Sequence, residues 1–277
     1  MDFEHVLVVG AGQMGGGIAQ VVAASGRHVS LYDPFPGATD RALATMGKSL
    51  GKLAEKGGAD PDEVLRRVTV VEEIVPAALL IEAVVEDLET KAEVFRTADG
   101  TLPGAAILAS NTSSIPITSL AAATGRPDRV IGMHFFNPVP VMGLIELTPS
   151  AATSEETFAL AESFGTQVLG KTCVRSSDEA GFIVNRLLIP YLFDAIRLYE
   201  RGFATKEDID TAIHLGLAHP MGPLRLSDLI GLDTVVSIGD VLRRAFGEAR
   251  YEAPALLRSL VAEGKLGRKT GEGFYSY

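Results

Sequence analysis

Residues 6–33 read VLVVGAGQMGGGIAQVVAASGRHVSLYD and combine three local patterns in one short stretch. The apolar run at 6–9 is rich in valine and ends in glycine, which is typical of a buried strand. A helical pattern over 14–25 follows and stops before Gly26, and a second short apolar run occupies 29–32. The order strand, glycine-rich turn, helix, strand predicts the start of a parallel sheet with right-handed crossovers.

The turn after the first strand matches the pattern G-x-G-x-x-G through Gly10, Gly12 and Gly15. In such a turn the first glycine permits a tight bend, and the second lets the backbone approach a pyrophosphate. The third lets the helix pack closely on the strand. The helix N-terminus around Gln13 and Met14 would present unpaired N–H groups to the phosphates. An ordinary glycine-rich loop can match the hexapeptide alone, but here a strand and a helix flank it.

An acidic residue, Asp33, ends the second predicted strand, close to the spacing expected after such a turn. A carboxylate at this place accepts hydrogen bonds from the adenosine ribose and repels a 2′-phosphate. The alternative is a plain turn residue before Pro34. Because the turn, its flanking strand and helix, and the acid coincide, we predict that the chain binds NAD(H) rather than NADP(H).

The whole chain has 277 residues, of which 47% are hydrophobic, and a formal net charge of −10. This acidity disfavours nucleic acid and anionic membrane surfaces as partners, so an anionic ligand would need a local positive patch or a helix N-terminus. No apolar run approaches the ~20 residues of a membrane-spanning helix, and we expect no signal peptide. The single cysteine, Cys173, excludes an intrachain disulfide, and we expect a cytoplasmic protein.

Alternating strand and helix patterns continue to about residue 180, and almost only helical patterns follow. We therefore predict an α/β fold class, with an N-terminal Rossmann-type doubly wound sheet over 1–181 and a C-terminal all-helical domain over 182–277. A helical hairpin at 38–67 is inserted in the first domain, and the polar segment 176–181 marks the boundary. Further strands are expected at 68–71, 79–85, 107–109 and 130–133, and further helices at 38–56, 61–67, 90–98, 182–201, from the N-cap Thr205 onward, 233–245 and 254–263.

Polar residues gather after predicted strands, at the edge where open parallel sheets bind ligands. The run Ser110-Asn111-Thr112-Ser113-Ser114 suits substrate contacts, although a polar loop with a helix cap explains it equally well. His134 is either a general base at a strand end or a histidine held by backbone hydrogen bonds. Glu146 lies in the apolar run 144–147, where an unpaired acid is costly, so we predict that it pairs with His134.

A hydrolase triad of serine, histidine and acid is the competing use of these groups. We disfavour it because we expect no G-x-S-x-G nucleophile elbow in the chain. No metal site is expected.

Several longer motifs add to the glycine fingerprint. They are Gly10 to Gly15, Ser110 to Ser114, HFFNPVPVM at 134–142, GFIVNR at 181–186, HPMGP at 219–223 and GRKTGEGF at 267–274. With these motifs the sequence resembles the L-3-hydroxyacyl-CoA dehydrogenase family over essentially its whole length. Within that family it is most similar to the bacterial short-chain 3-hydroxybutyryl-CoA dehydrogenases.

The resemblance implies NAD-dependent interconversion of (S)-3-hydroxyacyl-CoA and 3-ketoacyl-CoA, with short chains such as 3-hydroxybutyryl-CoA as substrates. It assigns four residues to catalysis: His134 as the base that removes the hydroxyl proton, Glu146 as its orienting partner, Ser113 as a donor to the substrate oxygen, and Asn185 as a holder of substrate and imidazole. It assigns cofactor contacts to Glu86, Lys91, Asn137 and Lys269.

Lys48, Lys52 and Lys56 recur every four residues in the predicted helix 38–56 and would share one face. Periodicity alone favours a solvated charged stripe. The resemblance instead matches Ser49 and Lys56 to positions that contact coenzyme A, and we take Lys52 as a third substrate-binding candidate.

Two other functions stay open. A sugar-acid dehydrogenase of the L-gulonate type shares the fold and would not need the lysines. A crystallin-type protein binds NAD without turnover, but the complete set of Ser113, His134, Glu146 and Asn185 argues against it. The resemblance also implies a homodimer through the helical domain, with apolar faces of 182–199 and 235–246 at the interface.

Overall fold

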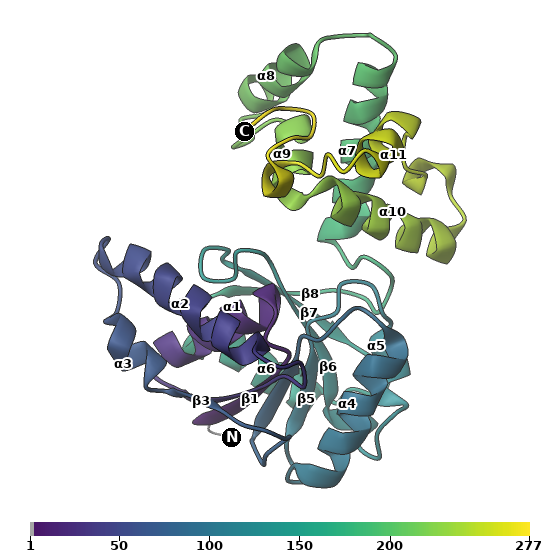
Figure 1. The fold of residues 1–277 in the computed structure, drawn as a ribbon. Helices are drawn as coiled ribbons and strands as arrows, with labels where there is room; N and C mark the ends of the chain where they lie inside the picture. Colours follow the sequence, from purple (N-terminus) through teal and green to yellow (C-terminus); the bar gives the residue numbers. More distant parts are fainter. Residues whose placement is uncertain (1–2) are drawn as a thin grey trace. The chain divides into compact units, whose positions relative to one another are not determined.

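The structure is a computed structural model that describes residues 3–277, and the chain divides into two compact units (Figure 1). The first unit ends at Glu179 and holds all the strands of the described residues. The second, Ala180–Tyr277, is helical. Each unit has its own hydrophobic core, so each is described by itself.

An eight-stranded sheet forms the first unit, in the order β3-β2-β1-β4-β5-β6-β7-β8. The strands are β1 (His5–Val9), β2 (His28–Tyr32), β3 (Val68–Val70), β4 (Leu79–Glu82), β5 (Ile107–Ser110), β6 (Val130–Phe135), β7 (Leu144–Pro149) and β8 (Thr172–Arg175). Neighbours from β3 to β6 pair in parallel, and the strand order reverses at β1, beside β4. β7 pairs antiparallel with β6, and β8 parallel with β7. The predicted doubly wound sheet is confirmed, with two strands of opposite direction added at one edge.

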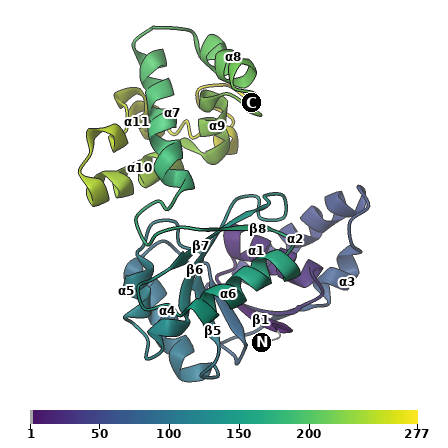
Figure 2. The same cartoon turned by 180° about the vertical axis from the view of Figure 1, so that it is seen from behind.

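Helices cover both faces of this sheet (Figures 1 and 2). They are α1 (Gln13–Ala24), α2 (Ala38–Ala54), α3 (Pro61–Leu65), α4 (Leu88–Thr101), α5 (Ile117–Ala121) and α6 (Glu155–Ser163), with a 3-10 turn at Pro127–Arg129 and a π-helical turn at Phe164–Val168. One core joins α1, α2 and α6 to alternate strand residues such as Val8, Ile81 and Met133. α4 and α5 bury Phe95 and Leu120 against the opposite face. Because both faces are covered, the central strands are apolar almost without interruption.

Two elements of the first unit end earlier than predicted. β4 ends at Glu82 rather than at 85, because the Glu82 carboxylate accepts a hydrogen bond from Val84 N (2.6 Å) and turns the chain. α2 ends at Ala54 rather than at 56, and Gly57 (φ +86°) takes the left-handed conformation in the turn that follows. Lys56 therefore lies in the turn after the helix.

The second unit consists of helices and short turns. They are α7 (Val184–Glu200), α8 (Lys206–Gly216), α9 (Pro223–Ile230), α10 (Leu232–Phe246) and α11 (Ala255–Ala262), with 3-10 turns at Ala249–Tyr251 and Arg268–Thr270. α7 starts later than predicted because Gly181 (φ +77°) and Phe182 (φ +46°) are left-handed and cannot belong to the helix. Thr205 caps α8 as predicted, since its hydroxyl accepts a hydrogen bond from Asp208 N (3.1 Å).

Candidate active site

The glycine-rich turn joins β1 to α1 at the carboxyl edge of the sheet. Gly10 has φ +101°, and a Cβ there would lie 2.5 Å from the carbonyl oxygen of Ala83. A Cβ on Gly15 would lie 1.8 Å from the carbonyl oxygen of Gly10, so this glycine lets α1 pack on the turn. A Cβ on Gly12 would meet no heavy atom of the described chain within 4 Å, so the backbone there is open to a ligand. This division fits a pyrophosphate that approaches Gly12.

The N-terminus of α1 is suited to an anion. Gly12 is its N-cap, no side chain of the described residues caps it, and its first turn contains no acid. Its first N–H groups, from Gln13 and Met14 onward, therefore carry a partial positive charge that no carboxylate of the helix's own first turn neutralises. Because the protein has a net charge of −10, an anionic ligand needs a local positive site, and this helix dipole supplies one.

A pocket of about 350 Å³ lies at the carboxyl ends of β2 and β3, with Tyr32, Asp33 and Phe35 among its lining residues. Phe35 is 67% exposed, which leaves its ring available to an adenine. Asp33 Oδ2 accepts a hydrogen bond from Ala11 N (2.7 Å), and Oδ1 accepts one from Phe35 N (2.9 Å). Each oxygen keeps a lone pair for a ribose hydroxyl. Asp33 thus also ties the glycine turn to β2, a role that sequence analysis did not identify.

Asp33→Asn is expected to raise the ratio of kcat/KM for NADP to kcat/KM for NAD by about tenfold or more, because it removes a charge that repels a 2′-phosphate. The amide oxygen of asparagine can still accept the hydrogen bond from Ala11 N, so the glycine turn should persist. Initial rates with the two cofactors measure the ratio. Asp62→Asn, on exposed α3, is the matched control, and an unchanged ratio in Asp33→Asn would contradict the role of Asp33.

His134 and Glu146 form a buried pair across two strands. The antiparallel register of β6 and β7 places them directly opposite each other. Nδ1 of His134 lies 2.7 Å from Oε2 of Glu146, so the predicted pairing is confirmed. Both side chains are buried, and the Phe136 ring packs on the imidazole with a centroid distance of 4.6 Å. The carboxylate therefore fixes the ring and favours the tautomer with its proton on Nδ1.

The serine-rich loop follows β5, beside β6, and Glu86 organises it. Glu86 Oε1 accepts hydrogen bonds from Thr112 Oγ1 (2.6 Å), Ser114 Oγ (2.8 Å) and Ser113 N (3.0 Å). Burial acts to raise the pKa of Glu86, but the Lys91 ammonium and these donors outweigh burial and lower it, so the carboxylate stays ionised. Glu86 thereby holds Ser113 beyond the carboxyl end of β5, at the edge where open parallel sheets bind ligands.

Lys91 joins Glu86 to a second acid, Glu82, that sequence analysis did not identify. Lys91 is 1% exposed, and its Nζ lies 2.7 Å from Glu82 Oε1, 3.3 Å from Val84 O and 3.3 Å from Glu86 Oε2. Glu82 Oε2 accepts a hydrogen bond from Ser110 Oγ (2.6 Å). The ammonium is therefore enclosed by protein groups, and the predicted contact of Lys91 with the cofactor stays a prediction.

Asn137 lies in the loop between β6 and β7 and is exposed. The Asn137–Pro138 peptide bond is cis. Val139 packs on α1, where a Cβ on Gly17 would lie 3.0 Å from the valine. On the other side, Lys171 Nζ donates to the carbonyl oxygens of Val139 (2.8 Å) and Met142 (2.6 Å). The loop that carries Asn137 is thus held from two sides.

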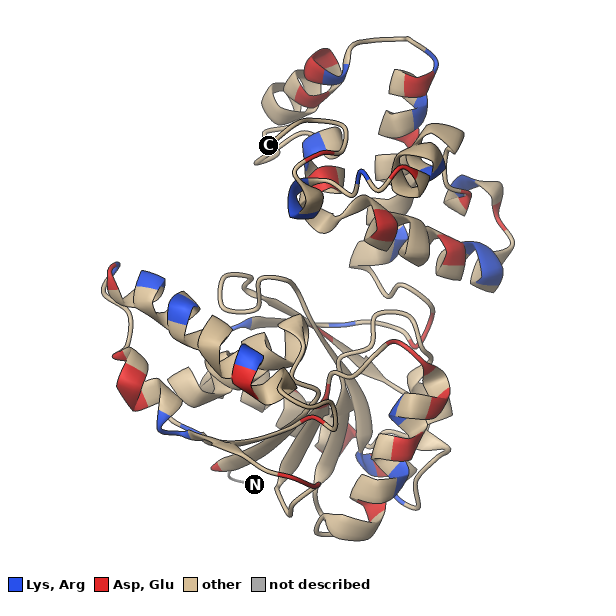
Figure 3. Cartoon of the chain, in the orientation of Figure 1, with Lys and Arg blue, Asp and Glu red and all other residues tan. Residues whose placement is uncertain are grey.

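α2 carries two of the predicted basic positions, and charged bands along it are visible in Figure 3. Lys48, Lys52 and Lys56 are all exposed, and none has a carboxylate partner among the described residues. Ser49 lies on α2 and is partly exposed. An unneutralised basic cluster on an acidic protein suits a ligand with phosphates.

Residues 47–51 read GKSLG and have the G-x-S-x-G spacing of a nucleophile elbow around Ser49. They lie inside α2, whereas a nucleophile elbow is a sharp turn from a strand to a helix. The pattern that we expected to be absent is therefore present in the sequence, but inside a helix it does not form a nucleophile elbow.

The two other candidates lie in the second unit. Asn185 is in the first turn of α7 and is buried. Lys269 Nζ lies 2.6 Å from Asp233 Oδ2, and this contact contributes to the lowered pKa of Asp233, against the opposing effect of burial. The roles of Asn185 and Lys269 toward substrate and cofactor stay predictions.

Known families match both units of the chain. The family model described as "3-hydroxyacyl-CoA dehydrogenase, NAD binding domain" matches residues 5–179, and that described as "3-hydroxyacyl-CoA dehydrogenase, C-terminal domain" matches residues 181–277. The chain belongs to the 3-hydroxyacyl-CoA dehydrogenase family. The predicted resemblance is thus confirmed, and the match assigns NAD to the unit that carries the glycine turn.

Relatives of this 3-hydroxyacyl-CoA dehydrogenase chain are similar over its full length. A 3-hydroxybutyryl-CoA dehydrogenase of Mycobacterium tuberculosis is 48% identical over 286 residues, which cover 99% of this chain and 98% of the relative. The crystal structure of M. tuberculosis FadB2 has 48% identity and a TM-score of 0.97, with 100% of both chains covered. That of (S)-3-hydroxybutyryl-CoA dehydrogenase PaaH1 from Ralstonia eutropha has 41% identity and a TM-score of 0.92, with 100% of this chain and 99% of that one covered.

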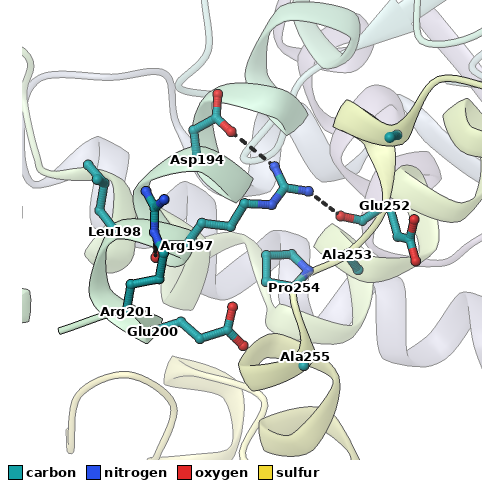
Figure 4. A pocket seen from close by; sticks show the side chains of 10 residues that line it. Asp194, Arg197, Leu198, Glu200, Arg201, Glu252, Ala253, Pro254 and Ala255 are labelled. Atoms are coloured by element: carbon teal, nitrogen blue, oxygen red, sulfur yellow. Dashed lines mark hydrogen bonds and ion pairs between the residues drawn. The ribbon is translucent and has the colours of Figure 1, made fainter. Parts of the chain in front are cut away.

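The helical unit of this dehydrogenase also has a pocket of about 720 Å³ between α7 and the start of α11 (Figure 4). Arg197 donates to Asp194 (2.9 Å) and to the carbonyl oxygen of Glu252 (2.6 Å). Glu200 accepts a hydrogen bond from Leu256 N (2.7 Å), in the first turn of α11. The bonds to Glu252 and Leu256 tie α7 to α11 and to the segment before it, so the charged lining of the pocket joins parts of the helical unit.

Over residues 3–277, no helix of the dehydrogenase has both the length and the apolar character needed to cross a membrane. In the same residues, no three His, Cys, Asp or Glu side chains are grouped as a metal site.

Proposed function

We propose that this chain is an NAD-dependent dehydrogenase that interconverts (S)-3-hydroxyacyl-CoA and 3-ketoacyl-CoA, with 3-hydroxybutyryl-CoA as the favoured substrate. The buried His134–Glu146 pair carries the proposal, because a histidine oriented by a carboxylate is suited to exchange a proton with a substrate hydroxyl. The pair lies on strands next to the serine-rich loop, in the unit whose glycine turn and Asp33 pocket fit NAD. Family membership and the names of the relatives support the same substrate class.

His134, Glu146 and Ser113 each have a separate part in the proton transfer. NAD, when bound, supplies the hydride acceptor. Nδ1 of His134 is engaged by Glu146, so we assign proton exchange with the 3-hydroxyl to Nε2. Glu146 stabilises the imidazolium that forms when the proton arrives. The Ser113 hydroxyl, held in place by Glu86 through its own backbone N–H, donates to the same substrate oxygen.

We infer that cofactor and substrate are bound by the remaining candidates as follows. Gly10 to Gly15 and the N-terminus of α1 hold the pyrophosphate, and Asp33 holds the adenosine ribose. By the family pattern, Glu86, Asn137 and Lys269 contact the cofactor and Asn185 contacts the substrate. KM values of Asn185→Ala for the acyl-CoA and of Lys269→Ala for NADH test the last two assignments, and values equal to wild type would contradict them.

The basic cluster of Lys48, Lys52 and Lys56 distinguishes an acyl-CoA dehydrogenase from a sugar-acid dehydrogenase, whose substrate carries no phosphates. If Lys52 and Lys56 bind the coenzyme A phosphates, the wild-type enzyme should have a KM for acetoacetyl-pantetheine about tenfold or more above that for acetoacetyl-CoA, since two charge-assisted contacts are lost. Lys52→Ala and Lys56→Ala should raise only the KM for acetoacetyl-CoA, and less so at high salt. NADH oxidation measures both rates. Lys265→Ala, which removes a half-buried lysine of the helical unit, is the control. Equal use of the two esters by wild type would contradict a coenzyme A site.

We also propose that the enzyme is a homodimer formed through the helical unit. Leu187 on α7 is 70% exposed and supplies an apolar contact. On the second predicted face, 235–246, Val235 and Leu242 of α10 are fully buried in the core of their own unit, so these two residues are not available to a partner. Sedimentation equilibrium tests the proposal: a mass of one 29.3 kDa chain at assay concentrations would contradict it.

A further inference from the structure

Glu82 is buried at the end of β4, beside the point where the strand order of the sheet reverses. Its side chain is fully buried, and none of the roles described above is assigned to it. Its two oxygens serve different segments of the chain. Oε1 accepts hydrogen bonds from Lys91 Nζ on α4 (2.7 Å) and from Val84 N (2.6 Å), and Oε2 accepts one from Ser110 Oγ on β5 (2.6 Å). A single carboxylate thus joins β4, α4 and β5.

These bonds close a ring with the serine-rich loop. From Glu82 the ring runs through Lys91 to Glu86 (3.3 Å), and from Glu86 to the segment 112–114. That segment returns to Ser110, whose hydroxyl also accepts a hydrogen bond from Thr112 N (3.1 Å). A closed ring limits the positions of its members more tightly than an open chain of contacts does. The member to which we assign the substrate oxygen is Ser113.

Stability alone is a weak reason for such an ion pair. Two charges removed from water lose hydration that their attraction often only balances, so well-packed apolar residues would serve the core as well. The neighbouring strand residues Leu79, Leu80 and Ile81 show that apolar side chains fit this part of the sheet. What an apolar residue could not do at position 82 is hold Lys91 and Ser110 at the same time.

We propose that Glu82 is a positioning residue of the dehydrogenase: by anchoring Lys91 and Ser110 it sets where Glu86 holds the serine-rich loop, and so where Ser113 meets the substrate oxygen. This inference rests on the proposed function. Without the Glu82 charge, the enclosed Lys91 ammonium has only Glu86 as a carboxylate partner and draws it away from the loop. Misplacement of a reacting group by about 1 Å can reduce a rate by about 100-fold.

Glu82→Gln is the direct test, because glutamine keeps the shape of the side chain and loses its charge. We expect kcat for acetoacetyl-CoA reduction to fall by about 10- to 100-fold, with less than about a threefold change in KM for acetoacetyl-CoA, since the basic cluster on α2 is untouched. Glu82→Asp keeps the charge on a shorter side chain and should retain an intermediate kcat. The matched control is Asp99→Asn, which removes the partner of Arg126 (2.6 Å) near the other end of α4. It should lower Tm and leave kcat unchanged.

The double variant Glu82→Gln with Lys91→Met separates positioning from stability. It leaves no unpaired buried ammonium, so Tm should recover toward wild type. The rate should stay low, because Glu86 has lost its anchor. Recovery of both Tm and kcat, or a Glu82→Gln enzyme with wild-type kcat and reduced Tm, would overturn the inference and leave a purely structural ion pair. Absence of turnover in the wild type would instead reject the proposed function, and with it the reaction that Glu82 is said to serve.

Discussion

His134→Ala is expected to lower kcat for acetoacetyl-CoA reduction by about 100- to 10,000-fold, the range that a positioned acid–base group contributes. The imidazole is buried beside Phe136, so bulk water cannot readily take over its role. The glycine turn and the Asp33 pocket are untouched, and affinity for NADH should therefore remain. The rate of NADH oxidation measures kcat, and a fluorescence titration measures NADH binding.

The matched control for this variant is His28→Ala, which removes an exposed histidine at the start of β2. It should have wild-type kcat and wild-type affinity for NADH. If His134→Ala turned over within about threefold of wild type, the proton transfer would have to be assigned to another group.

Glu146→Gln is the second change with a large expected effect. The glutamine amide can donate to Nδ1 of His134, where the carboxylate accepts, and this would move the imidazole proton to Nε2. The nitrogen assigned to the substrate would then be unable to accept a proton, and no charge would stabilise the imidazolium. The corresponding change in a serine protease triad costs about 10,000-fold, and we expect a loss of kcat between about 100- and 10,000-fold.

Glu146→Asp distinguishes this explanation from a general loss of fold. The shorter carboxylate keeps both the acceptor and the charge, so it should restore part of kcat that Glu146→Gln loses. Near-wild-type Tm in both variants, with unchanged affinity for NADH, would show that the change acts on chemistry. Equal kcat in Glu146→Gln and wild type would contradict the orienting role of Glu146.

The nucleotide-binding half of the site can be predicted from the sequence because its residues form local sequence patterns. The strand, the three glycines and Asp33 lie within residues 6–33, and each has a conformational or electrostatic reason to stand where it does. The pairing of His134 with Glu146 is also predictable, because a lone acid in an apolar run requires a partner. The antiparallel direction of β7 is not, since a short apolar run does not reveal which way its strand runs.

Glu82 shows what sequence reasoning misses. It stands inside the apolar run 79–85, where an acid requires a partner, but the sequence does not name that partner. Its burial depends on Lys91 and Ser110, which lie on two other elements. Asp178 is similar: it lies in the polar segment 176–181, but its carboxylate accepts hydrogen bonds from Ile117 N (2.6 Å) at the start of α5. Contacts between distant segments leave no local pattern from which the partners of either residue could be found.

The proposed reaction is tested most directly by following the hydride. NADH that carries two deuterium atoms at C4 of the nicotinamide is mixed with the full chain and acetoacetyl-CoA, and the product is examined by mass spectrometry. We predict (S)-3-hydroxybutyryl-CoA with one deuterium atom at C3. A product without deuterium, or no product from acetoacetyl-CoA while gulonate is oxidised with NAD, would contradict a 3-hydroxyacyl-CoA dehydrogenase.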